Sequence, residues 1–181
     1  MSSSNSAINM DGSLKKFEIP TPVTEAALAA RSGDVSKLSL LPTSDLLNVD
    51  DTGNTPLIWC ADRGHQEALN LILDVILKND PSSINKRGYL GNTALSRAAR
   101  GGHLECVINL LKMPNIDPNI ANDKMQYPLH FAAFKRKPEV VKALLDSKKC
   151  DSMVLDRKGR TPAEDTSDEN IRKMILESRS K

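Results

Sequence analysis

The chain has 181 residues, of which 39% are hydrophobic and 27% are charged, and its formal net charge at pH 7 is +2. This near balance argues against nucleic-acid or membrane binding driven by bulk electrostatics. No apolar run approaches the roughly 20 residues that span a bilayer, and residues 1–6 lack the basic-then-apolar order of a secretory signal. Three cysteines without paired spacing fit a reducing compartment. We therefore expect a cytoplasmic or nuclear protein that does not bind membranes.

Residues 1–22 are rich in serine and asparagine and end in Pro20-Thr21-Pro22, which disfavours helix. Their low hydrophobicity cannot offset the entropy lost on ordering them. We predict a flexible Ser-rich tail over residues 1–22 and a single repeat domain over residues 23–181.

A short sequence recurs along the rest of the chain. It reads TEAALAARSGD at 24–34, GNTPLIWCADRGH at 53–65, GNTALSRAARGGH at 91–103, YPLHFAA at 127–133 and GRTPA at 159–163. From Thr55 to Thr93, Tyr127 and Thr161 the spacings are 38, 34 and 34 residues. A period in the thirties indicates a solenoid of helical repeats, in which each unit buries its apolar face on its neighbours.

Each copy predicts two helices joined by a sharp turn. The threonines can cap the first helix with a side-chain oxygen, and proline at the first helical position costs no hydrogen bond. Glycines at 33, 64 and 101–102 end the first helix, because glycine enters left-handed backbone without steric cost. Apolar residues at helical spacing, such as Leu69, Ile72, Leu73 and Ile76, give the second helix its packing face.

These residues resemble the ankyrin repeat, whose signature is Thr-Pro-Leu-His-x-Ala with a period of about 33. The resemblance covers roughly residues 23–176. It implies an all-α solenoid of about five helix-turn-helix units with β-hairpin-like loops, including a capping repeat at each end. The units are expected at approximately 23–48, 49–86, 87–120, 121–154 and 155–181.

Two departures from the family pattern carry structural expectations. The second unit has additional residues between His65 and Asn85, so its second helix should be about one turn longer and end near residues 79–81. In the fourth unit, Met125 and Tyr127 stand where the family has a turn glycine and a capping threonine. We expect a distorted turn there.

Catalysis finds no support in the sequence. By resemblance, His130 ties a helix to a turn, and His65 and His103 open second helices. The cysteines lie on different elements without metal-ligand spacing, and no glycine-rich phosphate loop precedes a helix. We expect neither enzyme activity nor a cofactor or metal.

The resemblance places a row of side chains on a concave groove. Trp, Tyr and Arg are enriched at binding hot spots, and the few aromatic residues of this chain concentrate in that row. We expect Arg97 to bridge Trp59 and Phe131 from adjacent units. For those two aromatic residues, a half-buried packing role remains an equal alternative. The candidate partner-binding residues are Trp59, Arg63, Tyr89, Arg97, Arg100, Phe131, Phe134 and Lys135.

We interpret the chain as a monomeric protein–protein interaction module that binds a partner presenting carboxylates around an apolar anchor. One alternative is a regulatory, chaperone or targeting subunit of an enzyme assembly. Another is nucleic-acid binding through the basic C-terminal end, where residues 121–181 hold 14 basic and 10 acidic side chains. The fold alone does not decide between them.

Overall fold

A computed structural model describes residues 23–179 of the chain. The predicted tail over residues 1–22 lies outside the described residues. The α-helices are α1 (Glu25–Ser32), α2 (Val35–Leu40), α3 (Thr43–Leu47), α4 (Pro56–Arg63), α5 (Gln66–Asn79), α6 (Ala94–Gly101), α7 (Leu104–Leu111), α8 (Pro128–Phe134), α9 (Pro138–Asp146), α10 (Pro162–Asp165) and α11 (Glu169–Ser178), with 3₁₀ turns η1 (Pro81–Asn85) and η2 (Tyr89–Gly91).

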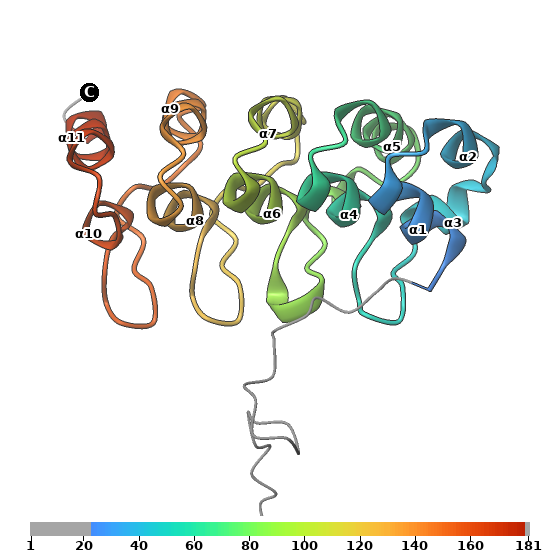
Figure 1. The fold of residues 1–181 in the computed structure, drawn as a ribbon, viewed down its shortest axis with the longest axis horizontal. Coiled ribbons are helices and arrows are strands. Elements are labelled where there is room, and N and C mark those ends of the chain that lie inside the picture. The colour runs from blue at the N-terminus through green and yellow to red at the C-terminus, as the bar shows by residue number, and fades with distance from the viewer. Residues whose placement is uncertain (1–22, 180–181) are drawn as a thin grey trace, which may run out of the picture.

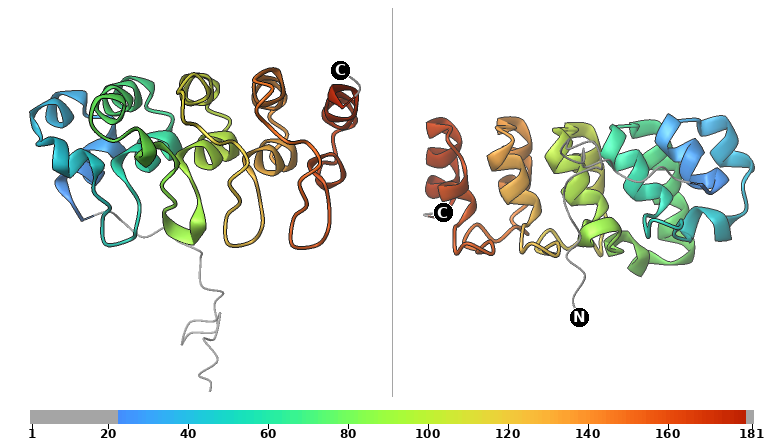
Figure 2. Two further views of the ribbon diagram at one scale, coloured as in Figure 1. Left: turned by 180° about the vertical axis from the view of Figure 1, so that it is seen from behind. Right: turned by 60° about the horizontal axis from the view of Figure 1, so that its bottom comes forward.

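The helices form two parallel rows, and a loop hangs below the inner row between successive units (Figure 1). The inner row is α1, α4, α6, α8 and α10, and each of these helices packs on the next. The outer row runs from α2 through α5, α7 and α9 to α11. The views in Figure 2 keep the same order, so the units stack along the long axis. Within residues 23–179 the structure confirms the predicted all-α array of five helix pairs.

The core lies between the two rows and between neighbouring inner helices. At one equivalent position, six residues after the helix cap, each of the first four inner helices has a fully buried alanine, whose small side chain allows the next helix to approach closely. The members of this set are Ala30, Ala61, Ala99 and Ala133. Each unit therefore depends on its neighbour to cover its apolar face.

The ends of the inner helices follow the sequence signals. The hydroxyls of Thr24, Thr55 and Thr93 accept from the amide three residues later at 3.2 to 3.3 Å. Gly33, Gly64 and Gly102 end their helices in left-handed backbone, with φ of 74°, 75° and 82°. Each threonine cap at the start of a helix contributes about 1 kcal/mol to stability. The predicted boundaries of these helices are confirmed.

Each inner helix from α4 onward follows a tight hairpin turn. Its first residue, Asp50, Gly88, Asn122 or Asp156, donates its N–H to the carbonyl of the fifth residue at 2.8 to 2.9 Å. In Asp50, Asn122 and Asp156, Oδ1 also accepts from the amides two and four residues later. The turn before α8 keeps this pattern, so the expected distortion there is wrong. Met125 adopts φ 57° in the place of a glycine, and the steric cost of that conformation is on the order of 1 kcal/mol.

Two features of the first units differ in length from a simple repeat. The helix α5 has 14 residues against 8 in α7, and it ends at Asn79, which confirms the predicted extension. The additional helix α3 packs on α4 and α5. The helix α3 was not predicted, because it has only five residues and no side-chain hydrogen bond at its N-cap, Pro42.

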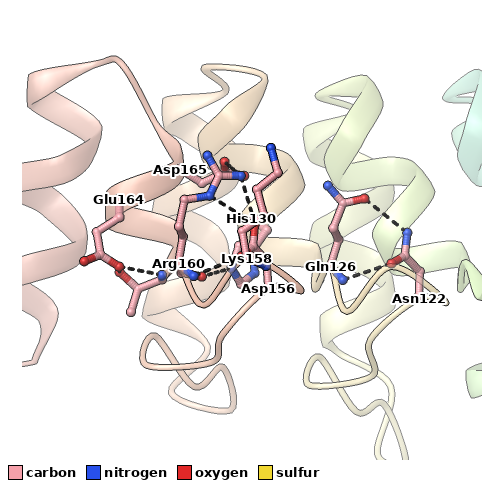
Figure 3. A network of polar contacts seen from close by, with 9 residues as sticks. Asn122, Gln126, His130, Asp156, Lys158, Arg160, Glu164 and Asp165 are labelled. Carbon is pink, nitrogen blue, oxygen red and sulfur yellow. Dashed lines mark hydrogen bonds and ion pairs between the residues drawn. The ribbon is translucent and has the colours of Figure 1, made fainter.

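A network of polar and charged side chains links the hairpin before α10 to α8 and α10 (Figure 3). Arg160 forms ion pairs with Asp156 and Asp165 at 2.8 and 2.6 Å. His130 Nε2 lies 2.9 Å from the carbonyl oxygen of Arg160, and it must be the donor because a carbonyl only accepts. His130 is fully buried. The predicted role of this histidine, tying helix to turn, is confirmed.

Burial lowers the pKa of His130 below its ordinary value of 6.5, although the hydrogen bond to Arg160 and the nearby carboxylates of Asp165 and Asp156 oppose the shift. The unfolded chain then binds a proton that the folded chain does not, so stability falls as pH drops below about 6.5. We predict that His130→Asn lowers the free energy of unfolding by about 1 to 3 kcal/mol. The variant should also show a weaker dependence of stability on pH. Urea unfolding of both proteins between pH 5 and 8 measures it. Parallel pH profiles for wild type and variant would contradict the assignment.

Candidate functional site

The repeat register arranges the candidate residues in two columns along the inner row. Four residues after the helix cap, the units carry Leu28, Trp59, Arg97, Phe131 and Asp165. Seven residues after the cap, the first four units carry Arg31, Asp62, Arg100 and Phe134. In the first column, Trp59 and Arg97 are buried and each contacts the second-column residue of the preceding unit.

Trp59 belongs to the interior. Its side chain is 1% exposed, and its indole Nε1 donates to Asp50 Oδ2 at 2.7 Å. Asp50 is the first residue of the preceding hairpin, so this bond ties the hairpin to α4. The guanidinium of Arg31, in the preceding unit, lies 5.6 Å from the indole centroid. The structure thus favours the packing role for Trp59 and removes it from the exposed surface.

Arg97 is also buried, at 3% exposure. Its Nη1 contacts Asp62 Oδ1 and its Nη2 contacts the carbonyl of Tyr89, both at 3.4 Å. The expected bridge between Trp59 and Phe131 is therefore wrong, because Arg97 turns to a carboxylate and the cation over Trp59 is Arg31. Burial lowers the pKa of Arg97, nearby Asp62 raises it, and nearby Arg100 lowers it further.

Phe131 is 9% exposed and belongs to the packed part of the column. Tyr89 is half-buried in η2, where its N–H donates to Asn54 Oδ1 at 2.9 Å. The space for Asn54 exists because Gly88 has no side chain; a Cβ there would lie 2.3 Å from Asn54 Oδ1. Phe131 is therefore buried, and Tyr89 is only partly exposed.

Four predicted residues do reach the surface. Arg63, Arg100, Phe134 and Lys135 are exposed, and the aromatic side chain of Phe134 has 55% of its area open. The ammonium of Lys135 lies 5.4 Å from the centre of the Phe134 ring. An exposed phenylalanine covered by a lysine is a combination that hot spots use, with an apolar anchor beside a charge.

The C-terminal ends of α4, α6 and α8 surround a hollow of about 380 Å³, which we call the basic hollow. It is lined by Asp62, Arg97, Arg100, Gly101, Lys135 and Lys137. Lys137 was not among the predicted binding residues. Its register, ten residues after the cap position and equivalent to His65 and His103, could have placed it here.

The histidines and cysteines have structural surroundings. His65 Nε2 and His103 Nε2 lie 3.0 and 3.2 Å from the carbonyls of Arg31 and Asp62, so each joins its unit to the preceding one. Burial raises the pKa of all three thiols, to about 11 for Cys106 and about 12 for Cys150. These thiols are protonated at neutral pH and are poor nucleophiles. Residues 23–179 contain no cluster of three or more His, Cys, Asp or Glu with metal-binding geometry.

None of the helices between residues 23 and 179 is both long and apolar enough to cross a bilayer.

Comparison with known protein families agrees with this architecture. Residues 26–122 match the model described as "Ankyrin repeats (3 copies)", and residues 126–157 match the model "Ankyrin repeat". The chain belongs to the ankyrin-repeat family. Ankyrin repeats are protein–protein interaction modules, so the chain is a module of this kind.

Relatives with assigned names share this region. The chain is 36% identical over 138 residues to the putative E3 ubiquitin-protein ligase XBAT31 of Arabidopsis thaliana, a match that covers 66% of the chain and 28% of the relative. It is 30% identical over 142 residues to the ankyrin repeat, SAM and basic leucine zipper domain-containing protein 1 of Microcebus murinus, covering 75% and 29%. The chain thus spans less than a third of the length of these relatives.

The sole tryptophan allows the corrected contacts of Arg31 and Arg97 to be tested. We predict that Arg31→Ala shifts Trp59 emission, because it removes the cation that lies over the indole. Arg97→Ala should leave emission unchanged but lower the free energy of unfolding by about 2 kcal/mol, because a cavity forms and Asp62 loses its partner. Fluorescence spectra and urea unfolding measure both. An emission change in Arg97→Ala alone would restore the original expectation.

Proposed function

We propose that the ankyrin-repeat protein binds another protein through the inner-helix face, meaning the exposed side chains around the basic hollow and Phe134. The partner would present acidic groups around an apolar anchor. The observation that carries this proposal is the exposed Phe134 ring next to a hollow lined by Arg100, Lys135 and Lys137. An apolar side chain this exposed, rimmed by charges, is typical of interaction surfaces.

The buried members of the column would act indirectly. Trp59 and Arg97 hold the hairpins and helices in position through Asp50, Asp62 and the carbonyl of Tyr89. We expect their removal to reduce binding by loosening the surface, and the exposed residues to make the contacts. The protein would act as a monomer in the cytoplasm or nucleus, without a cofactor or catalytic activity of its own.

The names of two relatives favour a second candidate function. XBAT31 and XBAT33 of Arabidopsis thaliana carry names that describe E3 ubiquitin-protein ligases, and the match to the second is 37% identical over 87 residues. By this analogy the repeats would serve as the targeting part of an enzyme assembly, in which the bound protein is presented to a catalytic subunit. Ubiquitin-ligase activity that is recovered together with the captured proteins would support this role. Its absence would support binding of a partner without a ligase.

We predict that Phe134→Ala and Arg100→Glu weaken partner binding, the first by about 2 kcal/mol or more, since a central apolar anchor is lost. Proteins captured by the full chain from a lysate are identified first, and their affinity is then titrated with each variant. The matched controls lie on the outer helix α5: Leu77→Ala removes an equally exposed apolar side chain, and Lys78→Glu reverses an exposed charge.

The proposal fails if the α5 variants abolish binding while Phe134→Ala and Arg100→Glu leave it intact. Nuclease treatment of the lysate and a salt series address nucleic acid. Binding lost on nuclease treatment, with a steep salt dependence, would replace the protein partner with a nucleic acid.

A further inference from the structure

The charges around the basic hollow do not balance. Its lining holds four cationic side chains, Arg97, Arg100, Lys135 and Lys137, and a single carboxylate, Asp62. That carboxylate already has neighbours, because Arg97 Nη1 lies 3.4 Å and Arg63 Nε lies 3.7 Å away. Cations gathered around one shared carboxylate repel one another, and an added anion would relieve this repulsion.

The charged groups of the rim cations have no partner in the fold. Within residues 23–179, no hydrogen bond or ion pair engages the side chains of Arg100, Lys135 or Lys137, and Lys135 meets only the Phe134 ring. Some arginines outside the hollow do form ion pairs, such as Arg87 with Asp123 at 2.6 Å and Arg160 with Asp156 at 2.8 Å. The donors around the hollow therefore remain available to a ligand.

Packing holds Lys137 in place before any ligand arrives. It occupies the register position of His65 and His103, the residues that cover the helix-ending glycine of the preceding unit. A Cβ on Gly102 would lie 2.6 and 2.7 Å from Cδ and Cε of Lys137, so the aliphatic stem runs directly over this glycine. The stem is fixed against the backbone, and less entropy is lost when the ammonium binds an anion.

Arg97 forms the floor of the hollow and is under-compensated. It is 3% exposed, its contacts with Asp62 and with the carbonyl of Tyr89 are long at 3.4 Å, and its Nε is buried without a hydrogen-bond partner among the described residues. Buried guanidinium groups normally have their donors satisfied. An anion bound next to Arg97 would add the negative charge that its long contact with Asp62 supplies only in part.

We propose that the basic hollow is an oxyanion-binding site that takes a carboxylate or phosphate group from a side chain of a protein partner. The inference rests on the proposed function and deepens it, because it assigns the acidic group of the partner to one site and the apolar anchor to Phe134. A nucleic acid is less favoured as the source. Its backbone would need a continuous basic track, whereas the hollow is a single site with a carboxylate in its wall and an aromatic ring beside it.

The test is a titration of the ¹⁵N-labelled full chain with sodium phosphate at pH 7, followed by NMR of backbone amides and arginine Nε–Hε groups. Sodium chloride at equal ionic strength is the reference. Saturable shifts are expected at residues 97–101 and 134–137. Arg100→Gln and Lys137→Gln should weaken the apparent phosphate affinity by about three- to tenfold. The matched controls Arg157→Gln and Lys158→Gln, in the exposed hairpin before α10, should leave it unchanged.

A parallel titration with sodium acetate distinguishes the two sources of the oxyanion. If phosphate saturates the site at a much lower concentration than acetate does, the partner group is a phosphorylated side chain. If the two anions saturate it at equal concentrations, the group is an aspartate or glutamate. Shifts that only follow ionic strength, or that persist unchanged in both hollow variants, would overturn the site. A short single-stranded oligonucleotide that shifts the hollow and the 157–160 hairpin together, at lower concentration than phosphate, would overturn the protein source.

Because the titration needs no partner, its failure and the failure of the proposed function are distinguishable. If the chain binds no phosphate but Phe134→Ala abolishes capture of the partner, the interaction face stands and the anion site is wrong. If the chain binds phosphate but neither Phe134→Ala nor Arg100→Glu affects capture of the partner, the anion site stands and the interaction face is wrong.

Discussion

The structure depends on the stacking of units that cannot bury their own apolar faces. Neighbouring inner helices approach over fully buried alanines such as Ala61 and Ala99, and this contact fixes the rotation and register of every unit relative to the next. Side chains at equivalent positions then form columns. A residue four places after a helix cap meets a residue seven places after the cap in the preceding unit, as Arg31 meets Trp59 and Asp62 meets Arg97.

These columns separate buried from exposed residues. From the second unit onward, a side chain in the first column is enclosed between units. A polar group there needs a partner, which the indole of Trp59 finds at Asp50. A side chain in the second column reaches the surface when nothing from the next unit covers it, as with Arg100 and Phe134. The chain therefore presents charge and an aromatic ring at fixed positions on a rigid frame, and rigid presentation lowers the entropy lost on binding.

The fold could be predicted from the sequence because its signals are local and repeated. Caps such as Thr55 and glycines such as Gly64 act within one helical turn, so each copy identifies its own boundaries. The candidate site was predicted less well. Whether Arg97 faces solvent or Asp62 depends on a contact between units 35 residues apart, and no local pattern encodes it. Lys137 was not predicted because the place of its ammonium depends on how its aliphatic stem packs over Gly102 of another unit.

If the charged groups of the cations around the hollow serve a ligand and not the fold, removing these charges should not destabilise the protein. Urea unfolding of the triple variant Arg100→Gln, Lys135→Gln, Lys137→Gln at low salt tests it directly. Because these side chains repel one another and have no ion-pair partners among residues 23–179, the free energy of unfolding should stay within about 0.5 kcal/mol of wild type or rise. A loss of more than about 1 kcal/mol would show that they hold the repeats together, and the functional account would be wrong.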